Sequence, residues 1–323
     1  MSTGTTGLPS KGVWLFPDSD AASLVRTVVA AESLGLDEIW LGDEGPGSRD
    51  PFSVLAAAAT LTRTITLGVA VTNPYLRHPA TIASTAMTLQ ELGAGRAVLG
   101  LGAGGELSLG PVHVQRDTPL ATITGAIRTI RSVTAAEQGD GYSPPGHAFA
   151  AAVPLYLGAR GEQLNRLAST SADGVFLGGI PFSMLDLTLS WATSVRQVDV
   201  ALYVNAVFDA DELDDIRPRL LHPFLDAPPV THARLGLDPA QLAQAASDLH
   251  GGDDRRARRL MTDELAGDLV LVGSPREVGR QLAALARQYR PRHIGLSFLT
   301  AAPDHHLDEA RAAFAALDEE LVG

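Results

Sequence analysis

The sequence contains no cysteine and only one lysine, Lys11, among its 323 residues. The absence of cysteine excludes disulfides, thiol nucleophiles and thiolate metal sites. Lys11 lies in no glycine-rich loop, so Schiff-base chemistry and a lysine-containing phosphate loop are also disfavoured. We therefore expect any bound anion to be held by arginine, histidine or backbone N–H groups.

Positive charge is also scarce, since 25 basic residues face 37 acidic ones and the net charge is −12. This balance argues against a general nucleic-acid binder, which needs a basic surface. No apolar run approaches the roughly 18 residues of a membrane-spanning helix. Residues 1–10 lack the basic start and apolar block of a secretory signal. We expect a cytoplasmic protein that acts on a small molecule.

Short apolar runs alternate with helical patterns along the chain. Eight strands are expected, each followed by at least one helix, at 12–16, 37–41, 64–71, 96–101, 153–157, 174–177, 198–208 and 293–298. Such alternation predicts a parallel sheet with right-handed crossovers. Eight units favour a closed (β/α)8 TIM barrel, a single domain over 1–323, with insertions after the fourth and seventh strands. In that fold the active site lies at the carboxyl ends of the strands.

Charged side chains follow the second and third expected strands. Asp43 and Glu44 could perform acid–base chemistry or hydrogen-bond a polar ring, or they could form a solvated turn. A proline-flanked pair, Arg77 and His78, could contact an anion or act as a base. Alternatively, this pair belongs to a rigid loop that starts the next helix.

Glycine-rich loops follow the fourth, fifth and sixth expected strands. Residues 100–105 match G-x-G-x-x-G, but 107–111 read as a loop rather than the helix that a dinucleotide fold requires. Residues 158–161 precede a helix and include Arg160. This loop and helix start could bind an anion, or they could form a plain connection with a surface arginine. With bare backbone at 178–179, these loops fit a ligand that has a phosphate and a flat ring.

Metal chemistry is not expected from this sequence. His305 and His306 are adjacent but lack a third ligand nearby. The motifs G-x-S-x-G, H-E-x-x-H and D-x-D-x-D-G are all absent, which removes three common hydrolytic and metal-binding signatures.

Five segments together resemble a known family. They are AAESLGLDEIWLGDE (30–44), LGVAVTNPYLRHPATIAS (67–84), GRAVLGLGAGG (95–105), PLYLGARGEQLNRLASTSADGVFLGG (154–179) and VGSPREVGRQLAAL (272–285). The chain resembles the bacterial-luciferase-like oxidoreductases over nearly its whole length, and within them the branch that uses the deazaflavin coenzyme F420. The TNPYLRHP segment is most similar to the methylene-tetrahydromethanopterin-reductase group.

The resemblance implies a barrel that binds a flavin or deazaflavin at its mouth, and a homodimer. A non-prolyl cis peptide in the third strand would support the ring. The implied cofactor-binding residues are Ala70, Val71, Thr72, Asn73, Gly102, Ala103, Gly104, Gly158, Ala159, Arg160, Gly161, Gly178 and Gly179. The candidate catalytic residues are Asp43, Glu44 and Glu106.

Two departures from the sugar-phosphate dehydrogenases of this branch concern the candidate acids. Those enzymes carry Asp-His after the second strand, where this chain has Asp43-Glu44. They also have glutamate directly after the glycine loop, whereas Gly105 precedes Glu106 here. Both differences weaken an alcohol-oxidation reading.

The sequence thus predicts a coenzyme F420-dependent oxidoreductase that transfers hydride between the deazaflavin and a small organic substrate. The long polar insertion at 209–268 is expected to cover the site and exclude water. An FMN-dependent monooxygenase of the same superfamily and a non-catalytic flavin-binding barrel remain alternatives. A barrel hydrolase or aldolase is disfavoured because no lysine or metal set lies at the strand ends.

Overall fold

A computed structural model describes residues 7–139, 141–299 and 306–323. Within these residues nine parallel strands form one sheet. The strands are β1 (Ser10–Leu15), β2 (Glu38–Leu41), β3 (Thr66–Thr72), β4 (Ala97–Leu101), β5 (Leu155–Gly158), β6 (Gly174–Gly178), β7 (Asp199–Val207), β8 (Val270–Val272) and β9 (His293–Phe298).

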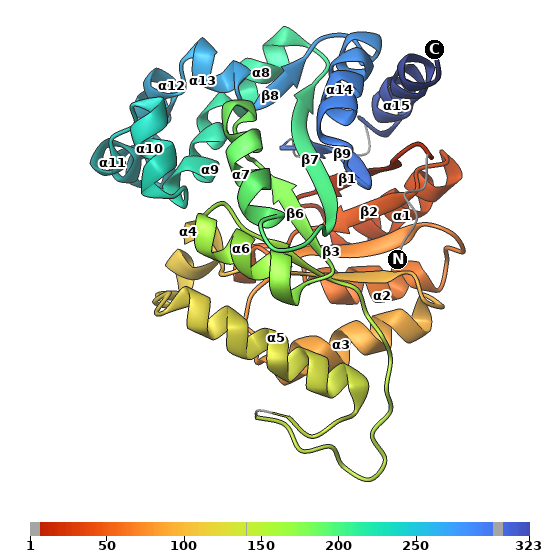
Figure 1. Ribbon diagram of the computed structural model, residues 1–323. Coiled ribbons are helices and arrows are strands. Elements are labelled where there is room, and N and C mark those ends of the chain that lie inside the picture. Colours follow the sequence, from red (N-terminus) through yellow and green to blue (C-terminus); the bar gives the residue numbers. More distant parts are fainter. Residues whose placement is uncertain (1–6, 140, 300–305) are drawn as a thin grey trace.

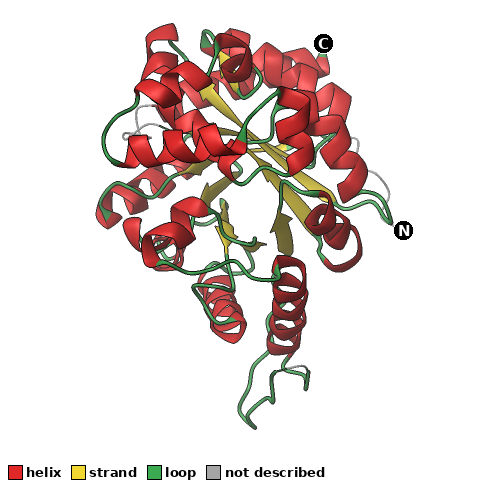
Figure 2. Cartoon of the chain, turned by 90° about the vertical axis from the view of Figure 1, so that its left-hand side faces the viewer, coloured by secondary structure: helices red, strands yellow, loops and turns green. Residues whose placement is uncertain are grey.

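Eight of these strands close into a barrel. Strands β1 to β7 pair in sequence order, β7 pairs with β9, and β9 pairs with β1 to complete the ring. Helices surround the strands (Figures 1 and 2). The predicted (β/α)8 barrel is confirmed, and its eight strands lie within a few residues of the expected ranges.

The principal barrel helices follow the strands, and their ends lie within a few residues of the predicted ones. They are α1 (Ala21–Ser33), α2 (Pro51–Ala59), α3 (Pro79–Leu92), α5 (Pro119–Ala135), α6 (Glu162–Ser171), α7 (Leu185–Ala192), α14 (Pro275–Tyr289) and α15 (Leu307–Val322). Helix α3 begins at Pro79, as expected for a residue without an N–H in a first turn. The predicted capping box of α14 also forms between Ser274 and Glu277.

One prediction of local structure is wrong, and one short strand was not predicted. Residues 107–111 were expected to be a loop, yet the short helix α4 (Glu106–Leu109) begins directly after the glycines and a 3-10 turn follows it. Gly105 caps α4, and the Ser108 hydroxyl accepts a hydrogen bond from the Gly105 N–H at 3.2 Å. Strand β8 was not anticipated, because it has three residues and directly follows the polar insertion.

The insertion after β7 packs around a core of its own. Its helices are α8 (Ala210–Ile216), α9 (His222–Leu225), α10 (Pro229–Leu235), α11 (Pro239–His250), α12 (Arg255–Leu260) and α13 (Asp263–Gly267). Buried Leu221, Phe224, Leu242 and Met261 form the centre of this second core. Strand β8 joins it to the barrel by pairing with the end of β7. In Figure 1 these helices gather at one end of the barrel, with α9 above α4.

Large aromatic rings fill the barrel interior. Trp40, Tyr156, Phe176 and Tyr203 cluster there, with the Phe176 and Tyr203 rings stacked at 5.0 Å. Room for the Trp40 ring exists because Gly68 on the neighbouring strand has no side chain, since a Cβ there would overlap the indole. The interior is therefore a packed plug, which confines any ligand to one end.

A buried carboxylate, Glu38, sits beneath this aromatic layer and is 1% exposed. It accepts hydrogen bonds from the Trp40 indole at 2.6 Å and the Tyr203 hydroxyl at 3.1 Å. Its other oxygen lies 2.6 Å from His293 Nδ1. Because each oxygen has a partner, burial leaves neither oxygen of Glu38 without a hydrogen-bonding group beside it.

The described residues between α5 and β5, 136–139 and 141–154, extend away from the barrel in both views (Figures 1 and 2). Among the helices of the described residues, none has the length and apolarity that a membrane crossing requires.

Candidate active site at the barrel mouth

A cavity of about 870 Å³ opens at the carboxyl ends of the strands, beneath the insertion. Its size lies within the usual range for small-molecule and cofactor sites. All predicted site residues except Thr72 and Asn73 line it: Asp43, Glu44, Ala70, Val71, Gly102, Ala103, Gly104, Glu106, Gly158, Ala159, Arg160, Gly161, Gly178 and Gly179.

Thr72 and Asn73 lie behind the cavity wall, at 0% and 1% exposure. The Thr72 hydroxyl donates a 2.6 Å hydrogen bond to Asp43. The Asn73 side-chain oxygen accepts from the backbone N–H groups of Tyr75 and Leu76. These two residues support the wall, rather than forming the surface that a ligand would touch.

The wall at β3 contains the expected irregularity. The Ala70–Val71 peptide is cis, and the pairing of β3 with β4 shifts register between Val69 and Thr72. The Trp14 indole on β1 donates a 2.7 Å hydrogen bond to the Ala70 carbonyl oxygen. The cis peptide predicted from the resemblance is thus present and faces the cavity.

Two of the glycines beside this bulge serve the protein's own packing. A Cβ at Gly102 or at Gly158 would lie 2.6 Å from a methyl group of Val71. The space that these glycines leave is therefore filled by Val71, and only their backbone faces the cavity. The glycines predicted at both positions are therefore required by the packing of Val71 in the β3 bulge.

Asp43 is held by Arg77, whose role the sequence alone left open. Arg77 donates from Nε to Asp43 at 2.8 Å and from Nη2 at 3.2 Å, and it also pairs with Asp50 at 2.5 Å. The neighbouring His78 caps α3 by accepting from the Ala80 N–H. Since Thr72 also donates to Asp43, both oxygens of this carboxylate have protein partners.

Glu44 differs from its neighbour because its carboxyl makes no hydrogen bond within the described residues. Burial raises the pKa of Glu44 to about 7. The Arg160 guanidinium opposes this rise, whereas the carboxylates of Asp43 and Asp226 add to it. At neutral pH, Glu44 can therefore carry a proton at the cavity wall and exchange it with a ligand.

Glu106 occupies a more exposed position at the start of α4. Its backbone N–H donates to Asp226 at 3.1 Å, and Arg116 donates to the other Asp226 oxygen at 3.0 Å. A Cβ at Gly105 would overlap the Asp226 carboxylate. Asp226, at the end of α9, thus links the insertion to the glycine loop, and we call these contacts the Asp226 clasp. The absence of a side chain at Gly105 makes them possible.

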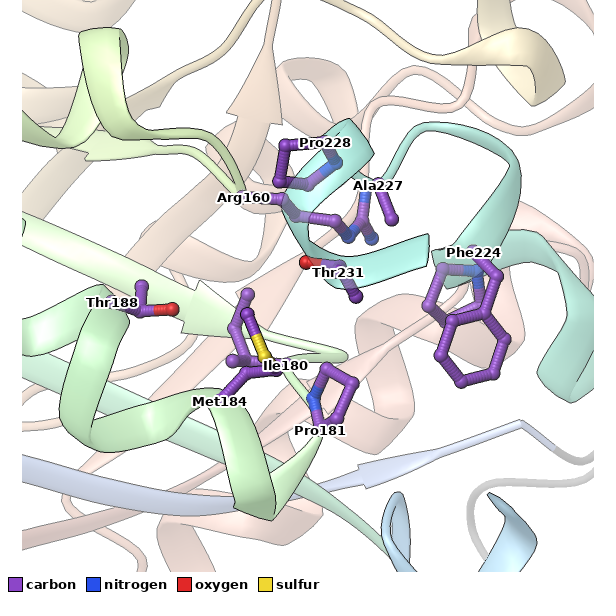
Figure 3. Close-up of a pocket in the computed structure, with 10 residues that line it drawn as sticks. Arg160, Ile180, Pro181, Met184, Thr188, Phe224, Ala227, Pro228 and Thr231 are labelled. Carbon is purple, nitrogen blue, oxygen red and sulfur yellow. The ribbon is translucent and has the colours of Figure 1, made fainter. Parts of the chain in front are cut away.

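The loop after β5 brings Arg160 and the start of α6 to the cavity. No side chain caps α6, and the N–H groups of its first turn have no intrahelical partner. Figure 3 shows the Arg160 side chain beside Pro228, Ala227 and Thr231 of the insertion. Open backbone and a guanidinium at a helix start form a surface suited to an anion.

Several lining residues were not found by sequence reasoning. The insertion contributes Arg219, His222 and Asp226, whereas β7 and β9 contribute Asn205 and Ser297. A polar residue within an apolar strand is a usable signal for the last two. The insertion residues carry no such signal, because their helices reach the cavity only through tertiary packing.

The barrel and its cavity agree with the family model that matches most of the chain. The model of the family described as luciferase-like monooxygenase matches residues 1–290. The chain belongs to this family. The predicted resemblance is confirmed at that level, and the family name itself leaves the cofactor and substrate open.

Relatives of the chain include a methanopterin reductase and an enzyme named for coenzyme F420. A 5,10-methylenetetrahydromethanopterin reductase of Methanolobus tindarius is 29% identical over 283 residues, which are 82% of this chain and 86% of the relative. An F420-dependent glucose-6-phosphate dehydrogenase of Nakamurella multipartita is 32% identical over 172 residues, covering 47% of this chain and 51% of the relative.

A solved structure supports the fold assignment. The coenzyme F420-dependent tetrahydromethanopterin reductase of Methanopyrus kandleri superposes with a TM-score of 0.75 at 22% sequence identity. The match covers 94% of this chain and 98% of the other. The luciferase-like barrel of this chain thus extends over nearly its whole length.

Of the two adjacent histidines near the last helix, the described one, His306, does not line the cavity. His305 falls outside the described residues, and the His306 ring lies against Phe298 at 5.1 Å and Phe208 at 5.9 Å. Within the part of the chain that the structure describes, no group of three or more His, Asp or Glu side chains is arranged to hold a metal.

Proposed function

We propose that the protein is a coenzyme F420-dependent oxidoreductase that transfers hydride between the deazaflavin and a small organic substrate. The observation that carries this proposal is the 870 Å³ cavity, which joins the β3 bulge, a protonatable carboxyl and an arginine in one space. The names of the F420-dependent glucose-6-phosphate dehydrogenase and of the F420-dependent tetrahydromethanopterin reductase structure support the choice of cofactor.

The residues present fit such a cofactor. The flat ring would lie against the Ala70–Val71 peptide, beside the 102–104 loop. The phosphate end would contact Arg160, Gly161 and the backbone at 178–179. Buried Arg160 Nε has no hydrogen-bond partner among the described residues, which leaves it available to an anion. Bound F420 would supply hydride chemistry at C5 of its ring.

The chain's own contribution would be orientation, water exclusion and proton handling. Glu44 would hold a proton at its carboxyl, because its pKa lies near neutrality and it has no internal partner. Asp43, held by Arg77 and Thr72, would stay fixed and hydrogen-bond a polar edge of the ligand. The insertion would shield the mouth through the Asp226 clasp.

An FMN-dependent monooxygenase is the second candidate, favoured by the description of the family model. A non-catalytic flavin-binding barrel is the third. The Glu44 carboxyl opposes that reading, because it faces the cavity with a pKa of about 7 and can exchange a proton with a bound ligand.

Titration of the purified protein with F420 and with FMN, followed by fluorescence quenching, separates the first two candidates. The proposal expects micromolar or tighter binding of F420 and weak binding of FMN. Tight binding of FMN alone would overturn it. Binding of F420 without exchange of hydride with any carbonyl, imine or alcohol substrate in a panel would favour the non-catalytic barrel.

The remaining parts of the proposal are a single domain over 1–323, a homodimer, a cytoplasmic location and no nucleic-acid partner. The homodimer is what the family resemblance implies, and light scattering on the purified protein tests it. The cytoplasmic location remains a prediction from the sequence. The net charge of −12 supports the exclusion of nucleic acid.

A further inference from the structure

Several basic side chains gather on one side of the cavity wall. Asp43 and Glu44 lie at the end of β2, whereas Arg160, Arg219 and His222 lie at the β5 loop and on the insertion. The protein as a whole is strongly acidic, so a basic corner inside its main cavity opposes the general charge balance. Such a corner draws an anion toward one end of the cavity.

The two acids beside this basic corner are paired with other arginines: Asp226 lies 3.0 Å from Arg116, and Glu162 lies 2.7 Å from Arg166. Within the described residues, neither Arg160 nor Arg219 forms an ion pair, whereas Arg116 on the same wall pairs with Asp226 at 3.0 Å. Arg219 donates one hydrogen bond, from Nη1 to the Leu299 carbonyl oxygen at 2.5 Å. That bond fixes the guanidinium at the cavity while the rest of its donors stay open.

Two buried nitrogen atoms in this corner have no hydrogen-bond partner. They are Arg160 Nε and His222 Nδ1. Arg160 lies close to the insertion, since a Cβ at Gly179 would be 3.5 Å from Arg160 Nη2 and 3.2 Å from Pro223, the residue after His222. Buried polar atoms without partners are rare in proteins, and a bound ligand is one established reason for them.

The charges of Arg160 and Arg219 also act on His222. Burial lowers the pKa of His222, and the positive charges of Arg219 and Arg160 lower it further against the opposing carboxylate of Asp226. An anion among these three side chains would favour the protonated form of His222 and supply hydrogen-bond acceptors to the two unpartnered nitrogens.

We propose that Arg219 and His222 of the insertion, together with Arg160, form a subsite for a phosphate or carboxylate group. The inference rests on the proposed function, which places a ligand in this cavity, and it adds two residues that sequence reasoning did not identify. The anionic group belongs either to the side chain of the cofactor or to the substrate. Both sources present the same chemistry, oxygen acceptors with negative charge.

Two variants test the subsite, Arg219→Gln and His222→Gln, because glutamine keeps polarity while removing the charge or the ring nitrogens. Arg234→Gln is the matched control, since Arg234 is an exposed arginine on α10 of the same insertion that does not line the cavity. Each variant is titrated with F420, which carries a phosphate and glutamate carboxylates, and with its deazaflavin ribitol fragment, which carries neither. Inorganic phosphate is then titrated into the F420-loaded proteins. Circular dichroism confirms that each variant is folded.

If the subsite holds the cofactor, both variants weaken F420 binding roughly tenfold or more, leave the fragment unaffected, and differ from the control. If it holds the substrate, F420 binding is unchanged, and phosphate binding to the loaded wild type is lost in both variants. Unchanged affinity for F420 and for phosphate in both variants would overturn the inference. Failure of the wild type to bind either F420 or the fragment would instead overturn the proposed function; phosphate binding to the free protein, lost in both variants, would still support the subsite.

Discussion

Replacing Glu44 by glutamine removes the carboxyl whose pKa burial raises to about 7. Below pH 4.5, its ordinary pKa, the carboxyl is protonated in both the folded and the unfolded chain, so the substitution changes little. As the pH rises toward 7, the unfolded chain loses this proton while the folded protein retains it. The wild type therefore loses stability over this range, and Glu44→Gln does not.

The size of the effect follows from the interval between 4.5 and about 7. It corresponds to at most roughly 3 kcal/mol. Urea denaturation of the wild type and of Glu44→Gln, from pH 4 to 8, measures the difference in unfolding free energy. We expect Glu44→Gln to be more stable at pH 8 and equal at pH 4. A difference that does not vary with pH would refute the reasoning.

The Glu32 carboxyl provides a control, because its effect on stability changes with pH in the opposite direction. Burial alone would raise the pKa of Glu32, but hydrogen bonds from the backbone N–H groups of Thr64, Ile65 and Arg63 outweigh it and lower the pKa to about 2. This carboxylate contributes stability above pH 4.5 that is lost as the pH falls toward 2. Glu32→Gln should therefore be destabilised at pH 7, opposite to Glu44→Gln at pH 8.

Two further predictions concern packing and hydrogen bonding. Glu38→Ala leaves the buried Tyr203 hydroxyl without its acceptor and should lower the unfolding free energy by about 2 kcal/mol or more; a loss well under 1 kcal/mol in urea denaturation would contradict this. Gly105→Ala places a Cβ against the Asp226 carboxylate and should cost about 1–3 kcal/mol. Gly47→Ala, in open space, is its control, and equal melting temperatures for these two variants would argue against the clasp.

The barrel was predictable because each of its eight strands leaves a local signal. An apolar run, a helix start such as Pro79 or a capping box such as Ser274–Glu277 can be read from adjacent residues. Strand β8 left no such signal, because three residues cannot show a period and their pairing with β7 depends on how the insertion packs.

The site residues also fall into those that the sequence could predict and those that it could not. Residues at strand ends could be placed from the barrel rule alone, and Asp43 and Glu44 do line the cavity. Their different environments could not be predicted, since Arg77 reaches Asp43 across the β3 loop and leaves Glu44 without a partner. Arg219, His222 and Asp226 enter the cavity from helices whose positions depend on the second core.

A crystal structure of the protein with bound F420 tests the central claim most directly. The account predicts the deazaflavin ring in the 870 Å³ cavity, against the Ala70–Val71 peptide and within reach of Glu44. A ring bound elsewhere on the protein, or an empty cavity in crystals grown with saturating F420, would contradict it.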